Sequence, residues 1–271
     1  MPELPEVETI ARDLARLLPG RRFAEVEVLR PDLVEGESAE AFAAALRGAR
    51  VRQVRRRAKN LVLDLGAQYL VVNLGMTGRL LVSADADPPP SHPGVRIRLD
   101  DGALLVYHDV RRFGRLQRYT LAAWAERDAA LGVEPLDEAF TPEWLQARAA
   151  ASRAPLKPWL MDQRHLVGVG NIYASEALFR AGLDPRRAAH TLAPAEALRL
   201  WRAVREVLQE AIDFRGTTLL DYRDARGEQG GFARRLRVYG RAGEPCRACG
   251  AAVTREVQAG RSTFFCPGCQ R

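Results

Sequence analysis

The chain has 271 residues, 47% of them hydrophobic, which is the length and composition of a globular protein with room for two cores. It has neither an apolar run of membrane-spanning length nor the basic-then-apolar start of a signal peptide, so we expect no membrane partner and a cytoplasmic, nucleoid-associated location. The formal net charge of +7 points to a polyanionic partner.

Two tracts carry almost all of this charge. Residues 47–59 hold seven basic and no acidic side chains, and residues 226–271 hold nine arginines against three glutamates. A charged tract is usually a solvated face, but two concentrated basic tracts in one chain favour nucleic acid as the partner.

The first predicted element is an amphipathic helix over residues 4–18. Its apolar side chains recur at helical spacing between Pro5 and Gly20, namely at Val7, Ile10, Leu14, Leu17 and Leu18. A proline at the start and a glycine after the end are typical helix boundaries. The apolar stripe requires a second layer on which to pack.

Three residues, Met1-Pro2-Glu3, precede this helix. The simpler interpretation is that they only open it, because proline and acidic side chains suit a first turn. The alternative requires removal of Met1, which would leave Pro2 with a secondary amine less basic than that of lysine. Such an amine can attack an aldehyde-like carbon and form an iminium. Glu3 could then move the accompanying proton.

Strand patterns follow between residues 61 and 106. Apolar residues alternate over 61–65, and further apolar runs follow at 69–74 and 95–99. Asp101-Gly102 predicts a two-residue turn into a last strand at 103–106. Residues 1–132 are therefore predicted to form a β-rich domain that carries the N-terminal helix.

Helical patterns dominate the next part of the chain. Residues 133–140 are expected to be a linker, since Thr141 and the two residues after it provide an N-cap, a proline and an early acid for a new helix. Two more helices are predicted over 171–181 and 195–214. Residues 217–235 lose this periodicity and are rich in glycine and charge, which predicts a mobile loop.

Four cysteines near the end of the chain form two Cys-x2-Cys pairs separated by sixteen residues: Cys246, Cys249, Cys266 and Cys269. Each pair can place two thiolates on one tetrahedral ion, which favours a structural Zn²⁺ over disulfides and leaves no open position for catalysis. The segment from Val238 onward is too short to bury a core alone, so zinc should fold it. Between the pairs, Arg255 and Arg261 would lie on a β-hairpin that can present a side chain to a phosphate.

Two further groups of residues fit contacts with DNA. Gly168-Val169-Gly170-Asn171 directly precedes a helix, where backbone N–H groups and Asn171 can seat a phosphate. A turn that needs positive φ explains the glycines equally well. A tight turn at 75–78 carries Met76, and Arg111 and Phe113 lie beside another turn. Apolar side chains are usually core, but one on a turn can wedge between base steps and fill the space of an extruded base.

These residues belong to segments that resemble the formamidopyrimidine-DNA glycosylase family, bifunctional base-excision repair enzymes for oxidised purines. The segments are PELPEVET at the start, RRRAKNLVLDL at 55–65, LGMTGRL at 74–80, DVRRFG at 109–114, LKPWLMDQ and VGVGNIYASEALF within 156–179, and VYGRAGEPCRACG and STFFCPGCQ near the end. They occur in the family's order over essentially the whole chain.

The resemblance implies an α+β fold in four parts. These are a catalytic β-sandwich domain with an N-terminal helix at 1–132, the linker at 133–140, a helix-two-turns-helix DNA-binding domain at 141–235 whose segment 217–235 is a lesion-capping loop, and a four-cysteine zinc-finger β-hairpin at 236–271. It also implies one structural Zn²⁺, a monomer, and double-stranded DNA with oxidised bases or abasic sites as the partner.

The resemblance further implies four catalytic roles. Pro2 matches the nucleophile that attacks C1′ of the damaged nucleotide, and Glu3 matches the acid that assists ring opening. Lys59 matches the lysine of β-elimination, and Arg261 matches the arginine of δ-elimination. Because arginine is too basic to be an ordinary proton donor, we expect Arg261 mainly to clamp a phosphate.

The remaining implied roles are contacts with DNA. The side chains that match those filling the gap left by the flipped nucleotide are Met76, Arg111 and Phe113. Backbone-phosphate contacts are matched by Asn171, with Lys157 and Tyr173 nearby, and approximately by His92 and Arg153. Asn73 stands where the family has histidine, so a phosphate contact there is expected to be weakened or lost.

Two other functions stay open. An endonuclease VIII-like glycosylase for oxidised pyrimidines is disfavoured by the PELPEVET start, by the match from Arg111 to Phe113 and by the long 217–235 loop. A non-catalytic zinc protein that binds damaged DNA is disfavoured because all four implied catalytic residues are present.

Overall fold

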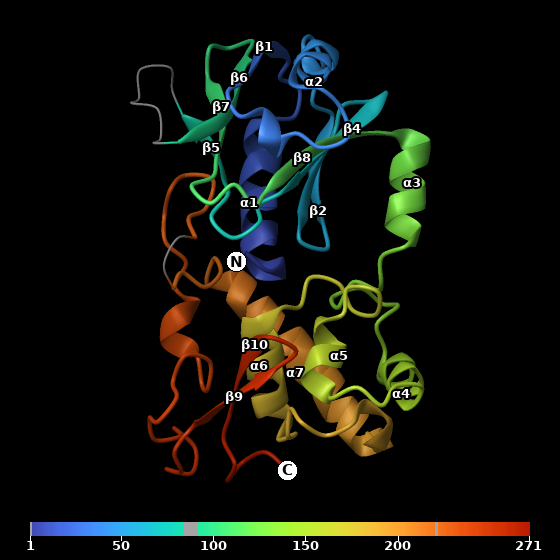
Figure 1. Cartoon of the computed structure of the whole chain (residues 1–271), viewed down its shortest axis with the longest axis vertical. Coiled ribbons are helices and arrows are strands. Elements are labelled where there is room, and N and C mark those ends of the chain that lie inside the picture. Colours follow the sequence, from blue (N-terminus) through green and yellow to red (C-terminus); the bar gives the residue numbers. More distant parts are fainter. Residues whose placement is uncertain (1, 84–91, 220–221) are drawn as a thin grey trace. The chain divides into compact units, whose positions relative to one another are not determined.

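The computed structural model describes residues 2–83, 92–219 and 222–271, which form two compact units (Figure 1). Unit 1 comprises residues 1–129 and 214–231, and unit 2 comprises residues 130–213 and 232–271. The chain therefore enters unit 2, returns to unit 1 after its longest helix, and ends in unit 2. Most of the segment 217–235, which the sequence attached to the helical part, makes its contacts in unit 1.

Unit 1 is built on two antiparallel four-stranded sheets, with strand orders β1-β6-β7-β5 and β2-β3-β4-β8. The strands are β1 Phe23–Val28, β2 Gln53–Arg57, β3 Asn60–Asp64, β4 Gln68–Asn73, β5 Arg79–Ser83, β6 Pro93–Leu99, β7 Leu104–His108 and β8 Arg115–Thr120. The predicted turn at Asp101-Gly102 joins β6 to β7.

The larger apolar core of unit 1 includes side chains of both sheets. The predicted first helix is present as α1, Leu4–Leu17, which lies beside β2 and β3 (Figure 1). Val7, Ile10 and Leu14 are at most 1% exposed, whereas Leu17 is 40% exposed and does not belong to the buried stripe. The other helical segments of this part are η1 Pro31–Leu33, α2 Ala39–Leu46 and α3 Leu121–Ala129.

Unit 2 is helical and ends in a two-stranded hairpin. Its elements are α4 Pro142–Ala150, α5 Leu156–Met161, α6 Asn171–Ala181, η2 Ala189–Thr191, α7 Pro194–Asp213, η3 Phe232–Arg235, β9 Thr254–Gln258 and β10 Arg261–Phe265. α6 contacts α5, α7 and β10. The predicted cap at Thr141 is confirmed, because its Oγ1 accepts the N–H of Trp144 at 3.1 Å. Gly182, with a φ of 70°, ends α6 as the sequence predicts.

In the described ranges, no helix combines the length and the apolar character needed to cross a membrane.

Candidate functional site

Pro2 and Glu3 are both buried at the start of α1. The backbone N–H of Glu3 donates to Oε2 of Glu6 at 2.8 Å, and Oε1 of Glu6 accepts the N–H of Thr217 at 2.7 Å. One buried carboxylate thus binds both the start of the chain and the segment 214–231, with which the chain returns to unit 1. Sequence reasoning missed this role of Glu6, although Glu6 lies within PELPEVET. Met1 lies outside the described residues.

Lys59 lies in the two-residue turn between β2 and β3. Its neighbour Ala58 has a φ of 54°, in the left-handed region that non-glycine residues disfavour. Arg56 supports this turn, since its Nη1 donates to the carbonyl of Ala58 at 3.1 Å and its Nε donates to the carboxylate of Glu8 at 3.0 Å. Because Glu8 belongs to α1, the turn of Lys59 is tied to the helix that follows Pro2.

Lys59 and Lys157 are the only lysines among the 41 lysine and arginine residues of the sequence. A lysine side chain can lose its proton within a protein, whereas an arginine side chain stays charged. The protonated lysine has three N–H donors in a tetrahedral arrangement. Apart from the N-terminal amine, the chain therefore has amines at these two positions alone, and every other lysine or arginine position holds an arginine.

The turns that carry Met76 and Phe113 are joined by Asp109, which is 2% exposed. Oδ1 of Asp109 accepts the hydroxyl of Thr77 at 2.5 Å, and Oδ2 accepts the N–H of Gly114 at 2.8 Å. Asp109 is a second residue whose part in the site the sequence did not reveal, although it opens the DVRRFG segment.

The same two turns touch through their backbones. A Cβ at Gly75 would lie 2.5 Å from the Phe113 carbonyl carbon and from the Gly114 nitrogen, so this approach requires glycine. Phe113 is 53% exposed, and the Arg111 guanidinium lies 4.7 Å from the centre of its ring. Met76 is half-buried. The structure therefore brings the three expected gap-filling side chains onto adjoining turns.

Asn73 uses its side-chain amide inside the protein. Its Nδ2 donates to Oδ1 of Asn60 at 2.9 Å, and its Oδ1 accepts the N–H of Gly75 at 3.0 Å. Asn60 follows Lys59 and Gly75 precedes Met76, so Asn73 bridges the two turns that carry these side chains. The weakened phosphate contact at Asn73 stays a prediction, which these two internal bonds favour.

In unit 2, Lys157 is 1% exposed. Its ammonium donates to Oδ1 of Asn171 at 2.5 Å, to the carbonyl of Ser262 at 2.7 Å and to Oγ1 of Thr263 at 3.0 Å. Lys157 therefore connects the start of α6 to β10, and it orients the side chain of Asn171.

Replacing this buried ammonium should destabilise unit 2. Lys157→Met fills a similar volume but leaves three acceptors without their donor, which we expect to cost about 3 kcal/mol of unfolding free energy. Urea unfolding followed by circular dichroism would measure the loss. Lys59→Met, at the half-buried turn lysine, is the matched control and should change the stability by much less. Equal midpoints for wild type and Lys157→Met would contradict the role of Lys157.

Asn171 also contacts Tyr239, a residue that sequence reasoning missed. Nδ2 of Asn171 lies 3.4 Å from the Tyr239 hydroxyl. Fully buried Glu176 fixes the segment of Tyr239, because its carboxylate accepts the N–H groups of residues 237, 238 and 239, each at 2.9 Å. Burial raises the pKa of Glu176, while these three bonds act in the opposite direction. The signal that could have found Tyr239 is its place in the VYGRAGEPCRACG match.

Gln163 shapes the predicted glycine turn before α6. Its Oε1 accepts the N–H of Gly168 at 2.8 Å, and its Nε2 donates to the carbonyl of Val169 at 3.0 Å. Both glycines of the turn are buried, and Gly168 has a φ of 80°. Of the two interpretations that the sequence left open, the turn with positive φ is confirmed at Gly168, and the phosphate seat stays a prediction.

The other expected site residues differ in exposure. Tyr173 is fully buried and packs against Phe232. His92 and Arg153, in contrast, are both exposed. Arg261 is also exposed, at the start of β10 after a two-residue turn, and it lines a cavity of about 200 Å³ between the hairpin tip and α5.

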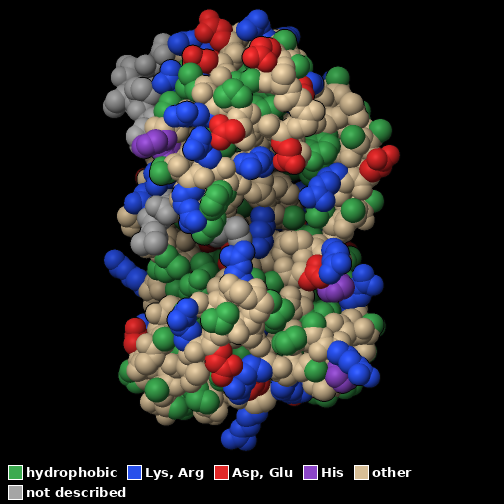
Figure 2. Space-filling model, viewed as in Figure 1, with side chains coloured by type: hydrophobic (Ala, Val, Ile, Leu, Met, Phe, Trp, Pro, Cys, Tyr) green, Lys and Arg blue, Asp and Glu red, His purple; other side chains and the backbone are tan. Residues whose placement is uncertain are grey.

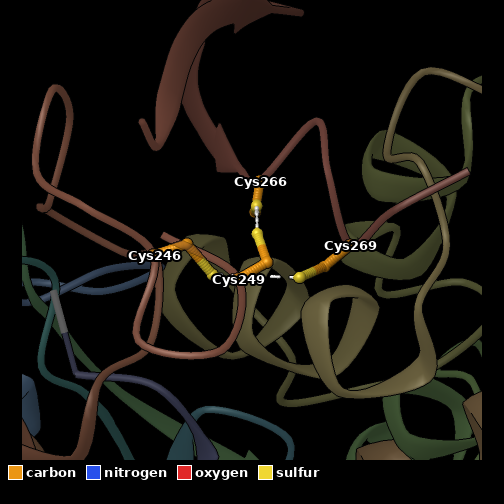
Figure 3. Close-up of side chains that lie close together, drawn as sticks. All are labelled: Cys246, Cys249, Cys266 and Cys269. Atoms are coloured by element: carbon orange, nitrogen blue, oxygen red, sulfur yellow. Dashed lines mark hydrogen bonds between the residues drawn. The ribbon is translucent and has the colours of Figure 1, made fainter. Parts of the chain in front are cut away.

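The four cysteine sulfurs lie within 4.8 Å of one another and point inward (Figure 3). The Cys246 and Cys269 sulfurs are 3.9 Å apart, and those of Cys249 and Cys266 are 3.4 Å apart. Tetrahedral ligation with Zn–S bonds of about 2.3 Å requires sulfur separations of roughly 3.8 Å. The four thiols therefore fit one structural Zn²⁺.

The whole chain is similar to known proteins. A protein from Edwardsiella ictaluri called formamidopyrimidine-DNA glycosylase is 45% identical over 271 residues, which cover all of both chains. A protein of the same name from Pelotomaculum thermopropionicum is 43% identical over all of this chain and 99% of its own. The chain belongs to the formamidopyrimidine-DNA glycosylase family.

Three family models match successive parts of the chain. The formamidopyrimidine-DNA glycosylase N-terminal domain matches residues 1–116, the formamidopyrimidine-DNA glycosylase H2TH domain matches 131–222, and the zinc finger found in FPG and IleRS matches 243–271. The α+β fold, the helix-two-turns-helix part and the four-cysteine zinc finger expected from the sequence are thereby confirmed.

Solved structures of formamidopyrimidine-DNA glycosylases share the fold over nearly the full length. The MutM (Fpg) protein of Thermus thermophilus has a TM-score of 0.89 at 45% identity, covering 99% of this chain and 98% of its own. Lactococcus lactis Fpg in complex with DNA that contains an abasic site has a TM-score of 0.92 at 30% identity, covering 99% of both chains.

Proposed function

We propose that the chain is a bifunctional DNA glycosylase and AP lyase of base-excision repair that excises 8-oxoguanine and formamidopyrimidines from double-stranded DNA. The observation that carries the proposal is the arrangement around α1 in a chain that matches formamidopyrimidine-DNA glycosylases over its whole length. Pro2 and Glu3 directly precede this helix. The turn of Lys59 is tied to the same helix through the bond between Arg56 and Glu8.

The proposed chemistry begins at the N-terminal amine. Once Met1 is removed, the Pro2 nitrogen attacks C1′, the damaged base leaves with a proton, and the sugar ring opens to an iminium. Glu3 carries the proton that ring opening requires. The iminium acidifies the neighbouring sugar proton, so an amine such as that of Lys59 can assist β-elimination of the 3′ phosphate. Arg261 holds phosphate for the following δ-elimination.

The proposed DNA contacts use the groups described above. Met76, Arg111 and Phe113 occupy the space of the extruded nucleotide, with Arg111 facing the orphaned base. Phosphates bind at Asn171 and Tyr239. The buried Lys157 and Tyr173 support this phosphate site without contacting DNA. His92 and Arg153 add outer contacts with the DNA. On the face drawn in Figure 2, Lys and Arg side chains cover more of the surface than Asp and Glu do. Such a surface suits a polyanion.

In this proposal the zinc ion takes no part in the reaction. Zn²⁺ bound by the four cysteines holds the hairpin that presents Arg261. We further propose that the protein acts as a monomer in the cytoplasm, at the nucleoid, and that the four-part division at residues 132, 140 and 235 describes its functional parts.

Borohydride trapping with paired lesion substrates tests the proposal. We expect a covalent complex with abasic DNA and with 8-oxoguanine opposite cytosine, and cleavage of the latter at least about tenfold faster than cleavage of thymine glycol DNA. The reverse preference would assign the chain to the endonuclease VIII-like alternative. Tight binding of lesion DNA without trapping or strand cleavage would leave the non-catalytic alternative.

A further inference from the structure

Arg215 joins two buried carboxylates where the chain returns to unit 1. Its Nη2 donates to Oδ2 of Asp13 at 2.6 Å, and its Nε donates to Oδ2 of Asp224 at 3.0 Å. The carboxylates are nearly inaccessible, because the side chains of Asp13 and Asp224 are 2% and 1% exposed, while that of Arg215 is 38% exposed. We call Asp13, Arg215 and Asp224 the ion-pair triad.

The triad has a single cation. Over the described ranges, Arg215 is the only basic side chain that forms an ion pair with either Asp13 or Asp224. A buried carboxylate is strongly unfavourable without a partner, so removal of the guanidinium would leave two uncompensated charges between α1 and the returning segment. The two parts can then stay in contact only if water reaches the carboxylates.

Asp224 also organises the chain around it. Its Oδ1 accepts the N–H groups of Arg226 and Glu228, each at 2.9 Å, and its own N–H donates to the carbonyl of Glu228 at 3.0 Å. Arg215 therefore binds a hydrogen-bonded turn at 224–228 rather than an isolated side chain. Through Asp13, it fastens this turn to α1.

The backbone of Arg215 is itself in the left-handed region, with a φ of 60°. Glycine adopts this conformation readily, whereas an arginine there is disfavoured. The next residue, Gly216, has a φ of 84°, and Thr217 then donates its N–H to Glu6. An arginine at a position whose backbone suits glycine indicates that the guanidinium is required.

We propose that Arg215 is a positioning residue that holds residues 216–219 and 222–231 on α1 before DNA binds, and so favours excision of a damaged base over cleavage of an abasic site. The inference rests on the proposed function, in which this segment covers the extruded base. An abasic site has no base to cover. If the capping segment is ordered only part of the time, the apparent affinity for the base is the intrinsic affinity multiplied by the ordered fraction.

Two activities of the full-length enzyme separate this role from a general loss of stability. We expect Arg215→Met to slow single-turnover excision of 8-oxoguanine about tenfold and to change abasic-site cleavage by less than about twofold. Asp13→Asn, which keeps the side-chain shape, should act in the same direction. Arg118→Met is the matched control, because Arg118 binds Glu37 elsewhere in unit 1, and its excision rate should equal that of wild type.

A third variant separates the guanidinium from the backbone strain. Arg215→Gly relieves the left-handed backbone but removes the ion pairs, and we expect it to lose excision as Arg215→Met does. Amide hydrogen exchange without DNA should become faster over residues 222–231 in both variants and stay unchanged in Arg118→Met. If Arg215→Met does not fold, Asp13→Asn and Arg215→Gly decide the question by the same readouts.

The outcomes distinguish this inference from the proposed function. A wild-type enzyme that cleaves neither substrate would refute the proposed function. A wild-type enzyme that cleaves both, together with variants that lose both activities equally or lose neither, would overturn only the role of Arg215. Unchanged exchange over residues 222–231 in an Arg215→Met protein with slow excision would also overturn it.

Discussion

An extra residue in front of Pro2 is expected to abolish borohydride trapping and to slow both base excision and strand cleavage by at least about a thousandfold. The reason is that an acylated proline nitrogen is an amide, which has no nucleophilic lone pair. Trapping on abasic DNA and single-turnover excision of 8-oxoguanine would measure the loss. The extension also has a steric consequence. Because Pro2 and Glu3 are buried at the start of α1, the added residues must pass from this buried position to the surface.

The matched control is the same protein after a protease has removed the extension and restored a free Pro2. It should regain trapping completely, and both forms should bind an uncleavable abasic analogue. Trapping that survives the extension would exclude Pro2 as the nucleophile. Lys59 would then be the first alternative, because it and the buried Lys157 are the only lysine amines in the chain. Mass spectrometry of the trapped peptide would show which amine reacted.

In unit 1, the strands that the sequence predicted are the central ones. Apolar alternation revealed β3, β4, β6 and β7, and each of these has a neighbour on both sides. The strands that it missed among the described residues of unit 1, β1, β2, β5 and β8, are the edges of its two four-stranded sheets. Edge strands often carry charged side chains that protect them from unwanted pairing, and in β1, β2 and β8 this charge conceals the apolar pattern, whereas β5 has a single charged residue. β2, for example, contains Arg55, Arg56 and Arg57, which the sequence showed only as a basic tract.

Part of that basic tract is used inside unit 1 rather than for a polyanion. Arg57 binds Asp128 at 2.5 Å, and Arg56 binds Glu8 at 3.0 Å. Sequence charge thus identified the kind of partner but not which arginines face it. Only the folded structure separates arginines that position Lys59 from those left for phosphate.

The candidate site divides in the same way. Residues whose chemistry is visible alone, such as Pro2 and the four cysteines, could be named from the sequence pattern, and the family resemblance added Lys59. Residues that act by holding others, such as Glu6 and Asp109, could not, because their partners lie far along the chain: Glu6 binds Thr217, and Asp109 binds Thr77. Local patterns carry no information on such contacts. The loss of periodicity after residue 216 likewise hid the ion-pair triad.

Removal of zinc is expected to have the largest effect on stability. Structural zinc contributes about 10 to 16 kcal/mol in small fingers. The apolar core around the site is small, with Val238, Val253 and Phe264 as its main aliphatic and aromatic members. A chelator, or Cys266→Ser at the fully buried ligand, should therefore unfold the β9–β10 hairpin and abolish δ-elimination, because Arg261 lies on that hairpin.

The unfolding should stop at a definite place. Residues 237–239 are bound to Glu176 of α6 by three hydrogen bonds that do not involve the cysteines, so they should keep their protection from hydrogen exchange while β9 and β10 lose theirs. Lys157 then loses its acceptors at Ser262 and Thr263, which transmits the loss to Asn171 at the start of α6. Phosphate binding should consequently weaken even where the helices remain folded. Restoring Zn²⁺ should reverse both effects, whereas a chelated protein with unchanged exchange in β9 and β10 would show that the hairpin folds without the metal.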